Sequence, residues 1–316
     1  MAVNRIQRRH SLDGGSRAAM EEYFDRCKEL TPRQFFAASA FDAQTEPEPG
    51  TGLPVLRWQT PCPSGYPAND RARVLLFTPH PGAPTVLMLH ALASRSDNGY
   101  RAWARRFNAA GWNACFVHLP YHYSRVPAGC YNGELAVTAD LVRTGEGLRQ
   151  GVVEARQLME WFRGQGVREF GLWATSYGGW IGALLLGVEA DFRFAVLQAP
   201  ISNVEHAIWE SPVTRHIRAE LTRSGVTQEI VQRHEHLTFP MRVRPACGPE
   251  RVLLAAGLWD QIVLAQDVAA LHRAWPGSAY LAVDQGHFGF RMAKECFRYL
   301  ERNGVIAPAD TGEMRI

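Results

Sequence analysis

One serine in this chain, Ser176, has the sequence surroundings of a catalytic nucleophile. Apolar residues 170–174 precede it and the helix-forming residues 181–186 follow it, which is the pattern of a strand, a tight turn and a helix. Such a turn presents a serine hydroxyl above the end of a sheet. The residues two before and two after the serine must be small, because the backbones approach closely there. Here they are Ala174 and Gly178, an A-x-S-x-G variant of the usual glycine motif, and we predict that Ser176 is a nucleophile.

A nucleophilic serine needs a base within hydrogen-bond reach and a group that orients the base. Two later apolar runs, 252–256 and 280–283, are each followed by a suitable loop residue, Asp260 and His287 respectively. Their order after Ser176 matches the order expected for this turn. Taken singly, Asp260 could be a helix N-cap and His287 an ordinary loop histidine; the joint pattern favours a triad. Glu205 stays open as an alternative acid.

Two backbone N–H groups are the candidate donors for an oxyanion. One belongs to Tyr177, at the start of the helix after the nucleophile, where free amides and the helix dipole favour an anion. The other belongs to Leu92, in the loop after the apolar run 85–90. We expect His90, at the start of that loop, to brace the loop without taking part in catalysis.

Other histidines raise the question of a metal site. His118 and His122 are four residues apart, but Pro120 between them makes a continuous helix unlikely. They therefore do not share a helix face, and no third ligand is apparent. The sequence also contains no phosphate-binding loop and no G-x-G-x-x-G fingerprint. We predict neither a metal nor a cofactor.

Aromatic residues are numerous in the segments that flank the predicted triad. Those in loops are better candidates for a substrate pocket than those in strands, because strand aromatics usually belong to the core. The expected substrate-binding residues are Trp259, Phe288, Tyr121 and Trp209.

Composition excludes several classes of protein. The 316 residues are 46% hydrophobic and 21% charged, with a net charge of +3 and no basic block beyond the arginines near the N-terminus, so a nucleic-acid partner is not expected. No apolar run approaches the roughly 20 residues of a membrane span. The six cysteines are scattered without C-x-x-C spacing. We predict a cytoplasmic protein with reduced thiols; the sequence leaves its oligomeric state open.

Short apolar runs alternate with longer helical patterns along most of the chain. We expect helices over 18–30, 101–110, 148–163 and 263–274. The eight expected strands are 55–59, 74–78, 85–90, 114–118, 170–174, 194–198, 252–256 and 280–283. This alternation predicts an α/β fold with a mostly parallel eight-stranded sheet and helices on both faces.

The chain divides into an N-terminal extension, 1–50, and one domain, 51–316. Within the domain, the stretch of about 201–249 lacks an obvious strand and contains amphipathic helical pieces. Placed after the sixth strand, it would lie over the carboxyl ends of the strands as a helical lid. The alternative is a set of ordinary surface helices.

From about residue 55 to the C-terminus, the chain resembles the α/β-hydrolase superfamily. The resemblance is carried by Ala174–Gly178 around Ser176, by His90-Ala91, by Asp260 and by Gly286-His287. The helical stretch 149–156 is similar to that of acetyl-esterase-like and dienelactone-hydrolase-like members. Ala174 and Ala91 depart from the family pattern, which usually has glycine at both positions.

The resemblance implies a serine hydrolase that cleaves carboxylic esters of small to medium acyl groups through an acyl-enzyme, without a cofactor. Its partner would be a small-molecule ester. A peptidase, or a thioesterase or acyltransferase, would use the same residues. A non-catalytic binding protein could also keep this fold, since fold does not fix function.

Overall fold

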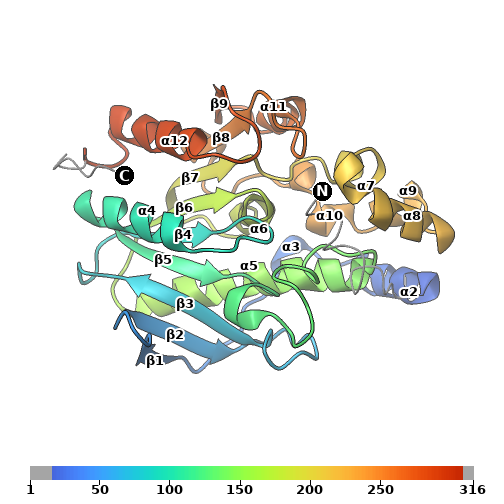
Figure 1. Cartoon of the computed structure of the whole chain (residues 1–316), viewed down its shortest axis with the longest axis horizontal. Helices are drawn as coiled ribbons and strands as arrows, with labels where there is room; N and C mark the ends of the chain where they lie inside the picture. The colour runs from blue at the N-terminus through green and yellow to red at the C-terminus, as the bar shows by residue number, and fades with distance from the viewer. Residues whose placement is uncertain (1–15, 309–316) are drawn as a thin grey trace.

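The computed structural model of the chain describes residues 16–308, which contain a nine-stranded sheet in the order β1-β2-β3-β5-β4-β6-β7-β8-β9 (Figure 1). From β5 to β9 all neighbouring strands are parallel, whereas β1, β2, β3 and β5 pair antiparallel. The strands are β1 (Gln44–Pro47), β2 (Pro54–Gln59), β3 (Arg71–Phe77), β4 (Thr85–Leu89), β5 (Asn113–His118), β6 (Phe170–Thr175), β7 (Phe192–Gln198), β8 (Val252–Gly257) and β9 (Ala279–Val283). The predicted α/β architecture is confirmed.

The sheet has one strand more than the sequence predicts. The eight expected strands correspond to β2–β9, and the additional strand is β1 at the edge of the sheet. All four of its residues, Gln44–Pro47, are exposed, so it lacks the apolar alternation that marks a half-buried strand. Short edge strands that end in proline are common in sheets. The sequence of β1 nevertheless resembles that of a linker, which is why the strand was not predicted.

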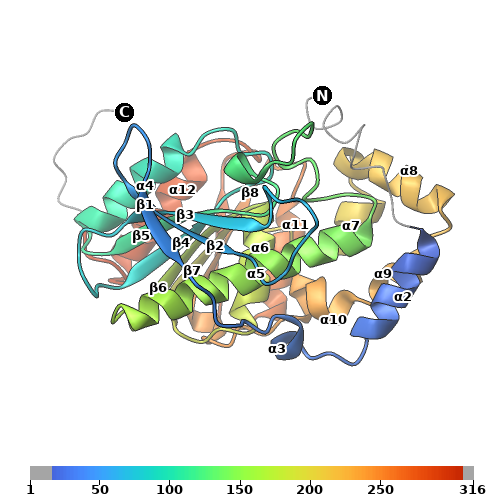
Figure 2. The same ribbon diagram turned by 90° about the horizontal axis from the view of Figure 1, so that it is seen from below.

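Helices cover both faces of the sheet. The helices α4 (Asn98–Ala109) and α12 (Arg291–Arg302) lie on one face, and α5 (Leu141–Gly164) and α6 (Tyr177–Leu186) lie on the other (Figures 1 and 2). Rings from α4 and α12 meet, with centroids of Trp103 and Phe297 5.4 Å apart. The four helices predicted from the sequence correspond to α2 (Arg17–Cys27), α4, α5 and α11 (Ala265–Ala274).

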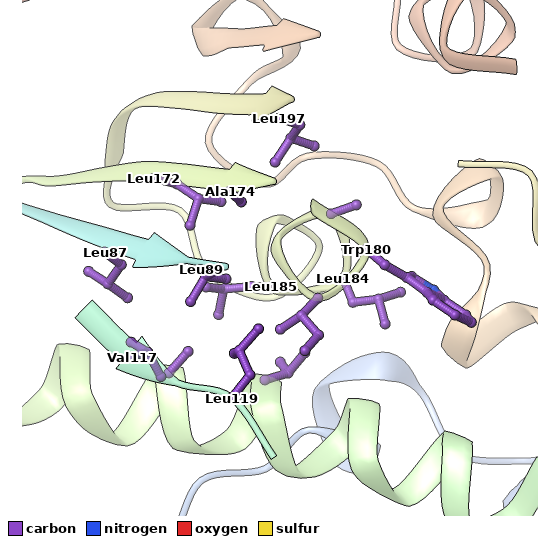
Figure 3. Packing of buried hydrophobic residues seen from close by; sticks show 14 of the residues in the cluster. Leu87, Leu89, Val117, Leu119, Leu172, Ala174, Trp180, Leu184, Leu185 and Leu197 are labelled. Carbon is purple, nitrogen blue, oxygen red and sulfur yellow. The ribbon is translucent and has the colours of Figure 1, made fainter. Parts of the chain in front are cut away.

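The core lies between the central strands and these helices. All five residues of β4 are buried, as expected for a parallel strand with both faces covered. Figure 3 shows Leu87 and Leu89 of β4 and Leu172 of β6 on the side where Leu184 and Leu185 of α6 pack. Full burial of each such side chain contributes about 1.5–3 kcal/mol to folding. The packing fixes β6 and α6, and therefore the turn between them.

The N-terminal part of the described chain packs on the domain. Tyr23 and Phe24 of α2 and Phe35 of α3 (Pro32–Phe35) are buried. The Tyr23 hydroxyl donates to Glu146 of α5 at 2.7 Å, and the ring of Phe24 stacks on that of His234 at 5.0 Å. The division of the chain at residue 50 stays a prediction.

The expected helical stretch after the sixth predicted strand contains four short α-helices. They are α7 (Val204–Trp209), α8 (Arg215–Arg223), α9 (Gln228–Gln232) and α10 (Glu235–Thr238). They lie beyond the carboxyl ends of the central strands (Figure 1); we call residues 201–249 the cap. Across residues 16–308, no helix is both long and apolar enough to cross a membrane. All six cysteines are free.

Candidate active site

Ser176 lies in the turn between β6 and α6 with a strained backbone. Its φ of 52° and ψ of −112° lie in a region that residues with a side chain rarely adopt. The Ser176 N–H donates to Gln198 O at 2.8 Å, and Ser176 O accepts from Trp180 N–H at 3.0 Å. The neighbouring strand and the first turn of α6 thus hold the strained residue in place, as a nucleophile elbow requires.

Small residues around the turn are needed for the close packing. A Cβ at Gly178 would lie 2.5 Å from Leu89 O, so only glycine fits beside β4. Ala174, where the motif usually has glycine, is accommodated by Gly182 of α6, whose ideal Cβ would lie only 3.1 Å from the Ala174 Cβ. The glycine in the helix thus leaves the space that the extra methyl group occupies.

The structure brings the three predicted triad residues together. Ser176 Oγ lies 3.1 Å from His287 Nε2, and His287 Nδ1 lies 2.7 Å from Asp260 Oδ2. A carboxylate only accepts hydrogen bonds, so Nδ1 carries the proton and Nε2 is left to accept from the serine hydroxyl. Ser176 and Asp260 are each 4% exposed. The arrangement can move a proton from serine to histidine while the carboxylate holds the imidazole in that tautomer.

Asp260 is fixed by its own loop as well as by the histidine. Its Oδ1 accepts the backbone N–H groups of Ile262 at 2.8 Å and Val263 at 2.9 Å, while Oδ2 faces His287. The predicted alternative acid, Glu205, lies in α7 and accepts from the side chains of Gln228 and Gln232 in the cap. The geometry therefore favours Asp260.

Leu92 and Tyr177 supply free backbone N–H groups beside the serine. Neither group donates to an acceptor among residues 16–308, and Leu92 borders the same cavity as Ser176. Tyr177 N–H is at the first position of α6, where the helix leaves such groups without partners. Two unpaired donors next to a nucleophile can bind an oxyanion; that role remains a prediction.

Two buried histidines brace the loop that carries Leu92. His90 Nε2 accepts the Leu119 N–H at 3.1 Å, and its Nδ1 donates to Ala91 O at 2.9 Å. His122 Nε2 accepts the Ala93 N–H at 3.1 Å, and its Nδ1 donates to Pro120 O at 2.8 Å. The contacts agree with the bracing role expected for His90.

Burial keeps these histidines neutral. It lowers the pKa of His90 well below its ordinary value and that of His122 to about 4. His118, also considered as a metal ligand, places its Nδ1 3.0 Å from Ser124 Oγ. Within residues 16–308, no group of three or more histidine, cysteine or acidic residues is arranged to hold a metal ion.

A cavity of about 190 Å³ opens beside Ser176 and His287. Its wall is mostly apolar. It is formed by the loop after β4, the stretch 126–140 with the start of α5, the turn between β6 and α6, the cap, the segment between β8 and α11 with the start of α11, and the loop after β9. Apolar residues in the wall are Leu92, Val137, Leu141, Trp180, Ile201, Val204, Ile208, Val213, Ile217, Ile262, Val263 and Phe288. An enclosed apolar wall with few polar groups is typical of a small-molecule site.

Of the four predicted substrate-binding aromatics, only Phe288 lies in the cavity wall. Trp259 is 70% exposed and donates its Nε1–H to Asp284 at 2.7 Å. Tyr121 is buried against Gly147 of α5. Trp209, at the end of α7, also lies outside the wall, so these three residues do not line the cavity and their part in substrate binding stays a prediction. Proximity in sequence to a site loop does not fix the direction of a large side chain.

Sequence reasoning missed most of the wall. The stretch 126–140 supplies Gly133, Val137 and Thr138, and its only signal was its length, since long loops without secondary structure are often functional. Ile217 could have been found from the amphipathic pattern of α8. Aliphatic residues on different elements carry no sequence signal that they share a cavity.

Solved structures with a similar architecture include esterases. The acetyl xylan esterase from Paenibacillus sp. R4 superposes with a TM-score of 0.63 over 95% of this chain and 98% of that one, at 13% identity. Acetyl xylan esterase 1 from Thermoanaerobacterium sp. JW/SL YS485 gives a TM-score of 0.62 over 94% and 96%, also at 13% identity.

Sequence comparison gives no activity. No protein-family model matches the chain. An uncharacterized protein of Mycobacterium tuberculosis strain H37Rv is 25% identical over 284 residues, which is 87% of this chain and 66% of that protein. The match therefore spans just under two thirds of the relative, whose own function is not described.

Proposed function

Because the chain has the α/β-hydrolase fold, we propose that it is a serine hydrolase that cleaves carboxylic esters of small to medium acyl groups. The observation that supports this most is the continuous hydrogen-bond chain Asp260–His287–Ser176, which ends at a cavity. The esterase names of the structural neighbours agree with the same chemistry, although at 13% identity they support the fold alone.

In the first half of the reaction, His287 Nε2 takes the proton of Ser176 as its oxygen attacks the ester carbonyl. Charge develops on the carbonyl oxygen, which the N–H groups of Leu92 and Tyr177 would stabilise. Asp260 stabilises the imidazolium that forms. His287 then gives the proton to the leaving alcohol, and an acyl group remains on Ser176.

In the second half, a water molecule replaces the alcohol. His287 removes a proton from the water, which attacks the acyl carbon, and the same backbone N–H groups bind the second oxyanion. Collapse returns the proton from His287 to Ser176 and releases the carboxylic acid. The sequence of steps is balanced without a cofactor.

Cavity size and polarity favour small to medium esters. A space of about 190 Å³ with a mainly apolar wall accommodates an acyl chain of a few carbons. The wall is closed on one side by the cap, which would restrict access of long polymers to Ser176. Hydrolysis of peptides or thioesters would use the same residues, so turnover assays on each class of substrate must distinguish these activities from ester hydrolysis.

The test combines covalent labelling with turnover. The wild-type protein should react with a fluorophosphonate probe at Ser176 and hydrolyse 4-nitrophenyl acetate and butyrate. Ser176→Ala should lose both properties. Ser224→Ala, at the end of α8 and outside the cavity, is the matched control and should keep both.

Three results would contradict the proposal in different ways. Absence of labelling and of turnover in the folded wild-type protein would support a non-catalytic role. Labelling that persists in Ser176→Ala would assign the nucleophile to another residue. Labelling at Ser176 with turnover of peptide or thioester substrates, but not of oxygen esters, would change the substrate class.

A further inference from the structure

A second histidine–carboxylate pair lies in the wall of the same cavity. His206 of α7 and Asp267 of α11 both border the cavity, with His206 Nδ1 3.3 Å from Asp267 Oδ2. Their side chains are 16% and 12% exposed. The triad does not use this pair, because Asp260 is bonded to its own loop and to His287, and His287 to Ser176.

Asn203 holds the second pair in place. Its Oδ1 accepts the His206 backbone N–H at 3.0 Å and so caps α7, while its Nδ2 donates to Asp267 Oδ1 at 3.1 Å. Asp267 thus has one carboxylate oxygen hydrogen-bonded to Asn203 and the other within ion-pair distance of His206. In the tautomer of His206 that carries its proton on Nδ1, toward Asp267, the Nε2 atom has a free lone pair. Among residues 16–308, no group donates to that atom.

Ser202 adds an unsatisfied hydroxyl to the same part of the wall. It precedes Asn203, borders the cavity and is 1% exposed, and its Oγ has no hydrogen-bond partner within the described chain. Buried polar groups in native proteins are almost always paired. An unpaired hydroxyl at a cavity wall is therefore expected to be satisfied by a ligand.

These groups determine which ligand chemistry fits. A hydroxyl can donate to His206 Nε2 and accept from Ser202 Oγ–H at the same time. A carboxylate is disfavoured by the nearby charge of Asp267. The rest of this wall, including Ile208, Ile262 and Val263, is apolar.

We propose that Ser202 and His206 form a hydroxyl-recognition site, with Asp267 and Asn203 as positioning residues. The natural substrate is then an ester with a mostly apolar body and one hydroxyl group away from the scissile bond. This inference rests on the proposed ester hydrolysis at Ser176. It goes further by assigning selectivity to a pair of side chains outside the triad.

The test uses esters that differ only by a hydroxyl group. Butyl butanoate is the parent, and 4-hydroxybutyl butanoate and butyl 3-hydroxybutanoate carry the hydroxyl on the alcohol and acyl sides, respectively. Acid release gives kcat/KM for each ester. In the wild-type protein we expect one hydroxylated ester to exceed the parent by about tenfold, since a site with buried polar groups discriminates against ligands that leave them unpaired.

The decisive variant is His206→Phe, which keeps an aromatic ring but removes the acceptor. The ratio of hydroxylated to parent kcat/KM should fall to about one. Ser202→Ala should lower the ratio too, and it provides the same test if His206→Phe does not fold. His216→Phe is the matched control, because His216 lies in α8 outside the cavity wall; it should keep the wild-type ratio.

The outcomes separate this inference from the proposed function. A ratio near one in the wild-type protein, or a ratio that His206→Phe and Ser202→Ala leave unchanged, overturns the recognition site while ester hydrolysis stands. Absence of turnover of all three esters, together with absence of fluorophosphonate labelling at Ser176, overturns the proposed function itself.

Discussion

Replacing Asp260 by asparagine tests the proposed mechanism most directly, because the structure fixes how the new side chain would lie. The Oδ1 position must accept the N–H groups of Ile262 and Val263 at 2.8 and 2.9 Å. Only the amide oxygen of asparagine can do this, so its NH₂ group must face His287 Nδ1. That group is a donor, and it selects the tautomer of His287 with its proton on Nε2.

A proton on Nε2 points at Ser176, so the histidine no longer accepts the serine proton. In a serine protease the corresponding change lowers kcat by about 10⁴-fold, which corresponds to about 5.5 kcal/mol of barrier. We expect a loss of similar size in hydrolysis of 4-nitrophenyl butyrate at pH 7.5. The hydrogen bonds to Ile262 and Val263 are kept, so the thermal unfolding midpoint should change little.

Glu205→Gln is the matched control for this change. Glu205 accepts hydrogen bonds from two glutamine side chains of the cap and lies outside the triad, so kcat should stay within about threefold of wild type, a barrier change of under 1 kcal/mol. Asp260→Asn with kcat within tenfold of wild type would refute the tautomer argument. A large loss of kcat in Glu205→Gln, with none in Asp260→Asn, would show that the acid is Glu205 and not Asp260.

Three further predictions concern the framework around the site. Gly182→Ala should cost about 1–3 kcal/mol of unfolding free energy through overpacking against Ala174, Leu197 and Leu172. In the Ala174→Gly background the cost measured in urea should be smaller, because one of the three close contacts is gone; equal costs would refute the compensation. The pKa of His122 is about 4 in the folded protein, below its unfolded value, so the free energy of unfolding should fall as the pH drops from 6.5 toward 4. Between pH 7 and pH 5, His122→Gln should lose about 2 kcal/mol less unfolding free energy than the wild-type protein in urea titrations. Parallel pH profiles of the two proteins would contradict this. Glu154→Gln removes the carboxylate that pairs with the fully buried Arg125, so the free energy of unfolding should drop by about 3–5 kcal/mol. A drop below 1 kcal/mol in chemical denaturation would show that the Arg125 charge is stabilised by another group.

The triad geometry could be predicted from the sequence because strands position it. Ser176, Asp260 and His287 each follow a parallel strand, β6, β8 or β9, of which β6 and β8 are buried. The carboxyl ends of parallel strands lie at one edge of the sheet, so apolar runs and a following polar residue were sufficient to bring the three together. The edge strand β1 was missed for the opposite reason, because its exposed residues carry no hydrophobic pattern.

The cavity wall could not be predicted in the same way. Most of its residues come from the cap, from the stretch 126–140 and from the loops after β4, β8 and β9, and their contacts depend on how those connections pack. Large aromatic side chains were a poor guide: Trp259 is 70% exposed, whereas Tyr121 is buried against Gly147 of α5. The burial of a side chain and the direction in which it points depend on tertiary packing, and an aromatic residue can lie either in the core or at the surface.

Under the two proposals, the histidine–carboxylate pairs place chemistry and selectivity on different parts of the fold. Asp260 and His287 are carried by the ends of neighbouring strands, which the core holds rigidly. The contact between His206 and Asp267 instead joins the cap to α11. Asn203 also binds Asp267, which lies 64 positions later in the sequence. Substitutions in the cap therefore reach one side of the bound substrate without displacing Ser176. On this scaffold, a change of substrate would require new residues in the connections, while the strands and the proton relay that they hold stay the same.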